Sequence, residues 1–272
     1  VASWLPPSGQ IAFPIVGQLK GWQVIFLTLS VPGILLALIV LAIREPIRRG
    51  SAAQERRLPV SAVVAHVAIH RAAYIGIGLG FALMILVGNG TGAWIPAFFA
   101  RKFGWSIAEI GARYGVVVLI CGGAGALTGG FLSSLLERRG HARGNLFATL
   151  FGFVALVPLT IGFPLVPSAG LALGLIGAMN FFAGLTLGGG LATLIDLTPN
   201  RMRAFVAAGY VVLVNLVGGA LGPTIVALIT DYGFADTQRL PHAIAITAAL
   251  FSPLSVLCLL VGMRGLGKAQ TA

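Results

Sequence analysis

Six long stretches of this sequence contain no Asp, Glu, Lys or Arg, and this feature limits the possible folds more than any other. The stretches are 21–43, 72–100, 114–136, 144–195, 204–230 and 240–263. A helix needs about 20 apolar residues to cross the roughly 30 Å hydrocarbon core of a bilayer. Only helices and closed barrels satisfy their backbone polar groups in lipid, and barrel strands are about 10 residues long. The sequence therefore predicts an all-α integral membrane protein.

The composition argues against a soluble protein. Hydrophobic residues make up 57% of the chain and charged residues 9%, whereas about 25% of the residues in an ordinary soluble domain are charged. The net charge of +11 lies in the breaks between apolar stretches, so it indicates membrane topology and no nucleic acid partner. Cys121 and Cys258 lie in separate stretches without a nearby His, so we expect neither a metal nor another cofactor.

The number of membrane spans follows from dividing the long stretch 144–195, which prolines interrupt near its middle. The resulting seven spans are about 21–43, 72–96, 109–136, 144–165, 169–196, 204–230 and 241–263. The chain starts at Val1 without Met, and the apolar stretch Ile11 to Val16 is much shorter than a span. We therefore expect a truncated helix before the first full span and a missing upstream part.

The basic residues predict the orientation, because Lys and Arg in short loops are retained on the cytoplasmic side. Alternate connections carry 13 of the 18 Lys and Arg residues, and we assign these connections to the cytoplasm. The longest of them, 44–71, is the natural linker between two helix groups. Its residues 60–70 form either a short interfacial helix or a solvated turn. The predicted organisation is a truncated bundle over 1–43, a linker over 44–71, a six-helix bundle over 72–263 and a cytoplasmic tail over 264–272.

Polar residues inside the spans are few and mark a candidate binding site. Asn89, Asn180 and Asn215 each lie near the middle of a different span, with Tyr210 as a weaker companion. Burying an amide without partners costs about 1–3 kcal/mol, so these amides either share a polar cavity or join neighbouring helices. The glycine-rich stretch 88–92 predicts a weakened helix beside Asn89. That favours a cavity, because transporters place substrate contacts at discontinuous helices.

The remaining charged residues near the spans do not indicate catalysis. The sequence contains neither H-E-x-x-H nor G-x-S-x-G, and we do not expect an enzyme. Asp196 ends a span beside Arg201 and Arg203, and we expect it to pair with them at the cytoplasmic surface. Arg113 lies one turn inside a span that begins with the capping-box spacing of Ser106 and Glu109. Its long side chain can anchor at the outer headgroups or lie at a cavity mouth.

Small residues four positions apart allow helices to approach closely in lipid. Six Gly-x-x-x-Gly pairs occur in the spans, which predicts tight helix packing. The pairs are Gly76/Gly80, Gly88/Gly92, Gly111/Gly115, Gly125/Gly129, Gly184/Gly188 and Gly218/Gly222.

Several local patterns resemble the major facilitator superfamily of transporters. Residues 21–33 and the ending Arg44-Glu45-Pro46-Ile47-Arg48-Arg49 resemble the sixth helix of that family and the linker after it. Residues 129–140, GGFLSSLLERRG, are similar to its cytoplasmic loop signature, with Ser134 where the family usually has Asp. The patterns most similar to the spinster-like branch are Trp94 to Phe99 with Gly104-Trp105-Ser106, Thr198 to Ala204, and Asn215 to Pro223 with Asp231.

The resemblance implies a permease of twelve helices that works by alternating access as a secondary active transporter. This chain would hold the end of helix 5, helix 6 and the C-terminal six-helix bundle, whose helices 7, 8, 10 and 11 face a central cavity. The implied substrate-binding residues are Asn89, Arg113, Asn180, Tyr210 and Asn215. The implied gating residues on the cytoplasmic side are Gly130, Ser134, Arg138, Arg139, Asp196, Arg201 and Arg203.

The expected partners are a small organic solute, membrane lipids and the N-terminal bundle of the same protein. Spinster-like relatives suggest an organic anion or a lysolipid as the solute, and a bacterial inner membrane is the expected location. The alternative function is a non-transporting helical module that acts through helix–helix association, since an isolated bundle would lack its opposing wall.

Overall fold

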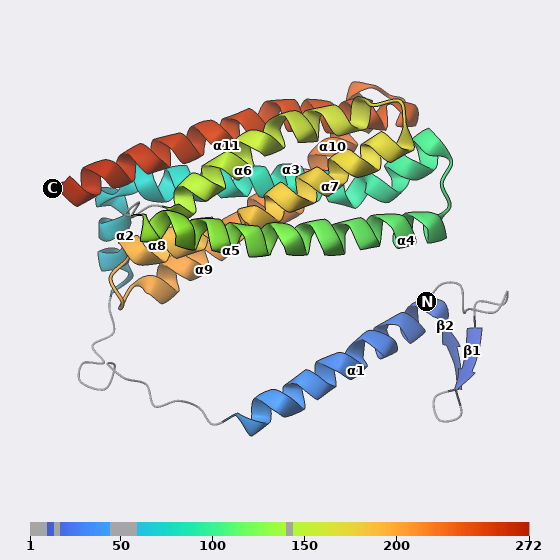
Figure 1. The fold of residues 1–272 in the computed structure, drawn as a ribbon, viewed down its shortest axis with the longest axis horizontal. Coiled ribbons are helices and arrows are strands. Elements are labelled where there is room, and N and C mark those ends of the chain that lie inside the picture. The colour runs from blue at the N-terminus through green and yellow to red at the C-terminus, as the bar shows by residue number, and fades with distance from the viewer. Residues whose placement is uncertain (1–9, 14–16, 44–58, 140–143, 272) are drawn as a thin grey trace. The chain divides into compact units, whose positions relative to one another are not determined.

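The computed structural model describes residues 10–13, 17–43, 59–139 and 144–271 (Figure 1). The chain divides into two compact units, Val1–Arg57 and Leu58–Ala272. The described residues are mostly helical, and six helical rods of the second unit are long and apolar enough to cross a membrane. The first unit adds a shorter apolar helical stretch, Phe26–Ala42. The predicted α-helical membrane fold is confirmed.

The first unit contains a small hairpin and one helix. Strand β1, Gln10–Phe13, pairs antiparallel with β2, Gly17–Lys20, and helix α1, Gly21–Ala42, follows. The backbone N–H of Lys20 donates to Oε1 of Gln23 at 2.8 Å, which begins α1 where the sequence places it. The described residues before α1 thus form strands and not the truncated helix that we expected. Pro14 and Gly17 disfavour a helix through this stretch.

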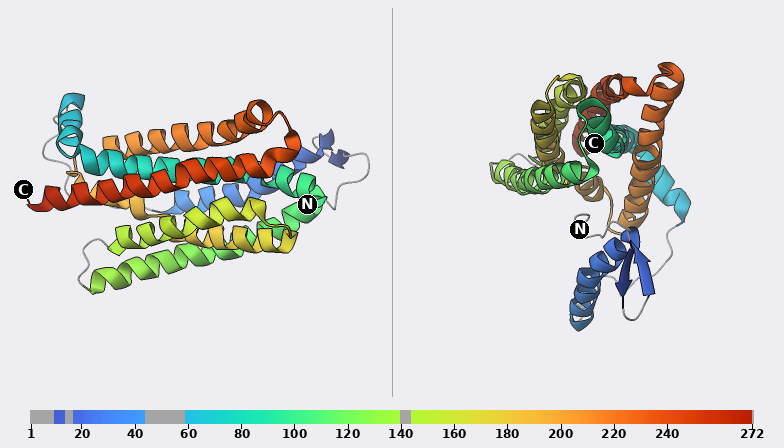
Figure 2. Two further views of the ribbon diagram at one scale, coloured as in Figure 1. Left: turned by 90° about the horizontal axis from the view of Figure 1, so that it is seen from above. Right: turned by 90° about the vertical axis from the view of Figure 1, so that its right-hand side faces the viewer.

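The second unit begins with α2, Val60–Ile69, so residues 60–69 form a short helix and not a turn, and its place at the membrane interface stays a prediction. The rest of the linker, residues 44–58, lies outside the described residues. Six rods follow α2 and run side by side (Figure 2). The first rod is α3, Arg71–Phe103. The second is α4, Ile107–Val117, the π-helical turn η2, Val118–Gly122, and α5, Gly123–Arg138.

The third rod is α6, Gly144–Gly162, with a 3-10 turn η3, Phe163–Leu165. The fourth is α7, Ala169–Leu185, followed by α8, Gly189–Leu197. The fifth alternates α and π turns: α9 Arg203–Leu213, η4 Val214–Leu221, α10 Gly222–Leu228 and η5 Ile229–Gly233. The sixth is the 3-10 turn η6, Thr237–Arg239, with α11, Leu240–Thr271.

Two rods extend beyond the ends that the sequence indicates. Helix α3 continues past Pro96 to Phe103 and ends at Gly104, whose φ of 70° is left-handed. Helix α11 continues through the expected tail to Thr271. Leu266 is buried, and a Cβ at Gly265 would overlap α3 near Ala72 and Ala73. Packing against α3 therefore keeps the start of the tail helical.

Glycines set the closest helix contacts. A Cβ added at Gly125 or Gly129 would overlap the α7 backbone at Phe181 and Leu185. Gly76 and Gly80 face α11 in the same way, and Gly218 and Gly222 face α3. The predicted close approach is therefore present for three whole pairs. The pairs Gly88/Gly92 and Gly111/Gly115 have nothing within 4 Å of such a Cβ, so these glycines are not packing contacts within the unit.

We call the predicted cytoplasmic end of the bundle the inner end; it carries α2 and the end of α11. There Nε2 of His66 on α2 lies 3.2 Å from the hydroxyl of Tyr74, which lies 2.7 Å from Oγ1 of Thr198. At the opposite, outer end, the rings of Phe99 and Trp105 stack with centroids 4.6 Å apart. At the inner end, side chains therefore join α2 to two rods, and at the outer end the connection after α3 packs back on α3.

Candidate solute cavity

The unit Leu58–Ala272 contains a cavity of about 290 Å³ between five of its rods. We call it the solute cavity. Its walls come from α3, α4, α6, α7 and α9, and residues of the α7–α8 break complete them. The lining residues are Phe81, Met84, Ile85, Gly88, Asn89, Thr91, Gly92, Ile95, Tyr114, Phe153, Leu156, Thr160, Ile176, Met179, Asn180, Ala183, Thr186, Leu187 and Tyr210. This is close to the lower end of the 300–1,000 Å³ range typical of small-molecule sites.

Two amides give the cavity its hydrogen-bonding capacity. Nδ2 of Asn180 donates to the carbonyl of Ile176 at 2.9 Å, one turn back on α7. Among the described residues nothing donates to its Oδ1, and the amide of Asn89 on α3 makes no side-chain hydrogen bond. Since an amide has two donors and an acceptor with two lone pairs, both side chains retain capacity for a ligand.

Tyr210 joins these amides in the cavity wall. Its ring lies edge-on to Phe81, with centroids 6.2 Å apart, and Phe81 in turn lies 5.0 Å from Phe153. A Cβ at Gly190 would come within 2.7 Å of both the Phe81 ring and the Tyr210 hydroxyl. The glycine therefore leaves room for this aromatic group, which lines the same cavity as the amides.

The fourth rod is broken beside the cavity. Thr186, Leu187 and Gly188 separate α7 from α8, and the first two line the cavity. Oγ1 of Thr186 donates to the carbonyl of Ala183 at 2.8 Å, so the hydroxyl satisfies a carbonyl at the end of α7. Irregular backbone inside a membrane protein is tolerated where it borders a cavity or is buried in protein. The glycines at 88–92 predict the weak helix in α3 instead, but α3 is continuous there.

Two of the five predicted substrate-binding residues lie outside this cavity. Arg113 is exposed, forms a salt bridge of 3.0 Å with Glu109, and lies over the Trp105 ring at 4.8 Å. These contacts hold Arg113 outside the cavity, and its anchoring at the headgroups stays a prediction. Asn215 is exposed on η4 and donates to the carbonyl of Val211 at 2.8 Å. The structure thus brings together Asn89, Asn180 and Tyr210 only.

The predicted gating residues lie near the inner end. Gly130, Ser134, Arg138 and Arg139 are exposed on or just after α5, and residues 140–143 of the following loop lie outside the described residues. Asp196 is exposed near the end of α8. Nε of Arg203 donates to the carbonyl of Thr198 at 3.0 Å, and no Asp196–Arg203 salt bridge forms in the described part of the chain. Arg201 is exposed just before α9.

Several cavity residues were missed from the sequence. Phe153, Leu156 and Thr160 belong to α6, a rod that we did not expect to face a cavity. Thr186 and Leu187 precede the run Gly188-Gly189-Gly190, and such a run of glycines is the sequence signal for this helix break. Tyr114 lies next to Arg113 in sequence but on the side of α4 that faces inward. Helix rotation, which sequence position does not show, separates these two residues.

Six rods that are long and apolar enough to cross a membrane, five of which line the solute cavity, define an integral multi-pass membrane protein. The chain belongs to the Major Facilitator Superfamily, whose family model matches residues 6–223.

Individual relatives agree with this family. The chain is 24% identical to an MFS-type efflux pump of Mycolicibacterium smegmatis over 250 residues, which are 90% of this chain and 57% of the pump. Over 86 residues, 31% of this chain and 12% of the relative, it is 35% identical to mouse solute carrier organic anion transporter family member 4A1.

Solved structures show the same fold. The chain is similar to a bacterial homolog of the human lysosomal transporter Spinster, solved inward-facing in unoccupied and occupied states. For the unoccupied state the TM-score is 0.52 and the identity 23%, over 92% of this chain and 59% of that one. The occupied state gives the same score and identity over 93% and 58%. The spinster-like resemblance is confirmed at the level of fold, and this chain spans less than two thirds of these relatives.

Proposed function

We propose that this chain forms the C-terminal half of a secondary carrier that moves a small organic solute across a membrane by alternating access. The observation that carries the proposal is the solute cavity, in which Asn89 and Asn180 retain hydrogen-bonding capacity within an otherwise largely apolar wall. The adjacent break at 186–188 supports it, because discontinuous helices border the substrate sites of many transporters. The similarity to an efflux pump supports the same class of function.

The lining favours an amphiphilic solute. Among the described residues, no Lys, Arg, His, Asp or Glu lines the cavity, so this wall offers aromatic surface and amides but no full charge. A lysolipid-like molecule fits this chemistry, with its apolar part against Phe81 and Phe153. The similarity to a mouse organic anion transporter supports an organic anion as the second candidate. For an anion, the balancing cation would come from outside this wall.

The proposed carrier needs an opposing wall. We assign residues 72–263 to one moving bundle, 44–71 to the linker, and 1–43 to the end of an N-terminal bundle that completes the solute site. On the inner side, Arg138 and Arg139 would contact that opposing bundle when the cytoplasmic entrance closes, with Gly130 and Ser134 on the facing part of α5. The bacterial relatives favour the inner membrane of a bacterium as the location.

Transport by the complete protein in proteoliposomes tests this proposal. Asn180→Ala removes an amide that lines the cavity, and Asn215→Ala is the matched control because Asn215 is exposed outside it. A net hydrogen bond contributes about 0.5–1.5 kcal/mol, so we expect Asn180→Ala to raise the KM for lysolipid or organic anion uptake roughly 2- to 10-fold. The control should leave KM unchanged. If Asn180→Ala left KM as unchanged as the control does, the solute would not bind in this cavity.

A further inference from the structure

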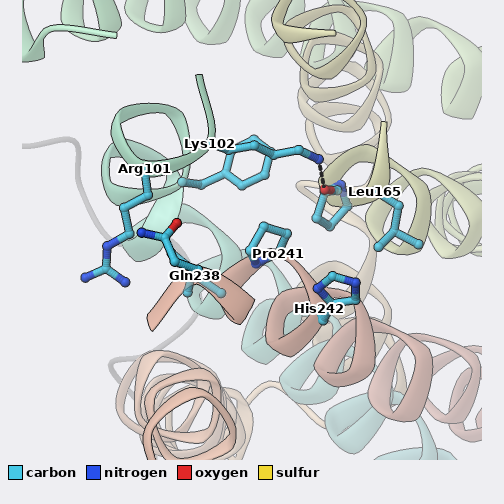
Figure 3. A pocket seen from close by; sticks show the side chains of 9 residues that line it. Arg101, Lys102, Leu165, Gln238, Pro241 and His242 are labelled. Atoms are coloured by element: carbon cyan, nitrogen blue, oxygen red, sulfur yellow. Dashed lines mark hydrogen bonds between the residues drawn. The ribbon is translucent and has the colours of Figure 1, made fainter. Parts of the chain in front are cut away.

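A second pocket lies at the outer end of the bundle and shares no lining residue with the solute cavity. We call it the outer pocket. It has a volume of about 330 Å³ and lies between the end of α3, the turn after α6 and the start of α11 (Figure 3). Arg101, Lys102, Gln238 and His242 provide its polar groups.

The two cationic side chains of the outer pocket, Arg101 and Lys102, donate hydrogen bonds to uncharged backbone carbonyls. Nζ of Lys102 donates to the carbonyl of Pro164 at 2.7 Å (Figure 3) and to the carbonyl of Val166, also at 2.7 Å. Nη1 of Arg101 donates to the carbonyl of Thr237 at 3.2 Å. In the described part of the chain, neither side chain has a carboxylate partner, and no carboxylate lines the pocket. The pocket is therefore lined by two cations without a carboxylate partner among the described residues, and their side chains point to opposite sides of it (Figure 3).

The acidic residue nearest to Gln238 in the sequence, Asp236, already has other partners. Oδ1 of Asp236 accepts from the backbone N–H of Gln238 at 2.8 Å, and Oδ2 lies 3.9 Å from Nε of Arg239. Asp236 thus orders the turn that presents Gln238 and does not neutralise Arg101 or Lys102. The Lys102 ammonium keeps one of its three donors, and Arg101 keeps donors beyond Nη1.

The floor of the outer pocket is apolar and firmly packed. Phe98 and Leu240 are buried, and the Phe98 ring lies 5.5 Å from Phe163 and 5.2 Å from Phe99. The ammonium of Lys102 also lies 5.6 Å from the Phe98 centroid. Such a floor suits the organic part of an anion, while the cations suit its oxygen atoms. Partial burial also strengthens the attraction between opposite charges relative to bulk water.

We propose that the outer pocket binds the oxyanion group, a phosphate or a carboxylate, of an amphiphilic anion at Arg101 and Gln238, which lie on the same side of the pocket, while Lys102 adds positive charge from the opposite side (Figure 3). The two sources with this chemistry are a free organic anion and the headgroup of an anionic lipid. The stacked Trp105 nearby belongs to the aromatic residues that favour the headgroup level. The site is independent of the proposed transport, and it would bind its ligand even in a protein that does not transport.

Binding to the complete protein in nanodiscs tests the proposal for both sources. In one arm, benzoate is titrated by calorimetry into protein in phosphatidylcholine nanodiscs. In the other, native mass spectrometry counts phosphatidylglycerol retained from mixed nanodiscs. We expect saturable binding in at least one arm, weakened at least tenfold by Arg101→Gln and by higher salt, which screens exposed charges. Arg71→Gln is the matched control, since it removes the same charge at the inner end of α3.

A second variant distinguishes loss of the binding site from loss of the fold. Lys102→Gln would also release Pro164 and Val166, so Leu165→Trp is used instead, because it fills the pocket from its exposed rim without changing the charge. It should weaken binding as Arg101→Gln does, while the protein still elutes as a single folded species. Absence of saturable binding in both arms would overturn the proposal. So would binding that Arg101→Gln and Leu165→Trp leave intact.

Discussion

Gly129 and Gly130 are adjacent in α5, but their surroundings are opposite. A Cβ at Gly129 would overlap the backbone of Leu185 on α7, whereas a Cβ at Gly130 would have nothing within 4 Å. In lipid, where no hydrophobic effect draws helices together, such close backbone contact is a main source of association. One position of this pair therefore supports the α5–α7 contact, and the other faces outward.

Alanine at each position gives a direct prediction. Gly129→Ala should lower the free energy of unfolding by about 1–3 kcal/mol through overpacking. Gly130→Ala should leave it unchanged or raise it by up to about 1 kcal/mol, because alanine is the better helix former. Thermal unfolding of the purified protein in one detergent measures both. Equal loss in the two variants would show that the α5–α7 contact is not as close as described.

Single side chains were the hardest part of the site to predict. The sequence shows that Asn89, Asn180 and Asn215 lie at similar depth, but not which way each helix is turned. Asn215 and Arg113 are exposed, while Tyr114, one residue from Arg113, lines the cavity. A one-residue step along a helix turns the side chain by about 100°. The direction in which a side chain points therefore depends on how the rods pack, and the positions of polar residues in the sequence do not show this.

Among the elements, α2 is joined to the bundle by a short chain of polar contacts. The Tyr74 hydroxyl lies within hydrogen-bond distance of both His66 on α2 and Thr198 after α8. Arg203, at the start of α9, bonds the carbonyl of the same Thr198. Three rods therefore meet at Thr198 at the inner end, and α2 is joined to them through Tyr74.

Tyr74→Phe should loosen α2 without unfolding the rods. The change removes both contacts of the hydroxyl, at a net cost of about 0.5–1.5 kcal/mol for each bond. Amide hydrogen exchange over Val60–Ile69 should become faster, whereas exchange over α3 beyond its first turns should not change. Tyr232→Phe is the control, because Tyr232 is 83% exposed. Unchanged exchange in α2 would show that its apolar face alone holds it.

The elements themselves were largely readable from the sequence. Charge-free length is a local property, and the predicted spans overlap the rods closely, as at 144–165 and 169–196. The interruptions inside the rods could not be predicted from charge-free length. The glycines at 88–92 predict a weak point in α3, but α3 is continuous there, and of these glycines only Gly90 packs against a neighbouring helix in the described part of the chain, at Gly222. The break falls instead at 186–188.

For the whole molecule, the orientation remains a prediction from the basic loops. In a variant with Cys121 and Cys258 replaced by alanine, Arg139→Cys and Ala235→Cys would place single thiols at opposite ends of the bundle. An impermeant maleimide added to intact cells should label residue 235 and should label residue 139 only after permeabilisation. Labelling of both thiols from the same side would contradict the alternation of spans.

The π turns of the second and fifth rods have a mechanical consequence. Each such turn holds a surplus residue relative to an α turn, because its hydrogen bonds close around five residues instead of four. If the surplus moves along the rod, the stretch it passes rotates by about 100° while both rod ends keep their places. In the fifth rod, η4 begins four residues after Tyr210. If the π turn moved a short way toward the inner end, the Tyr210 side chain would rotate out of the wall of the solute cavity, and the helix would not slide through the bilayer.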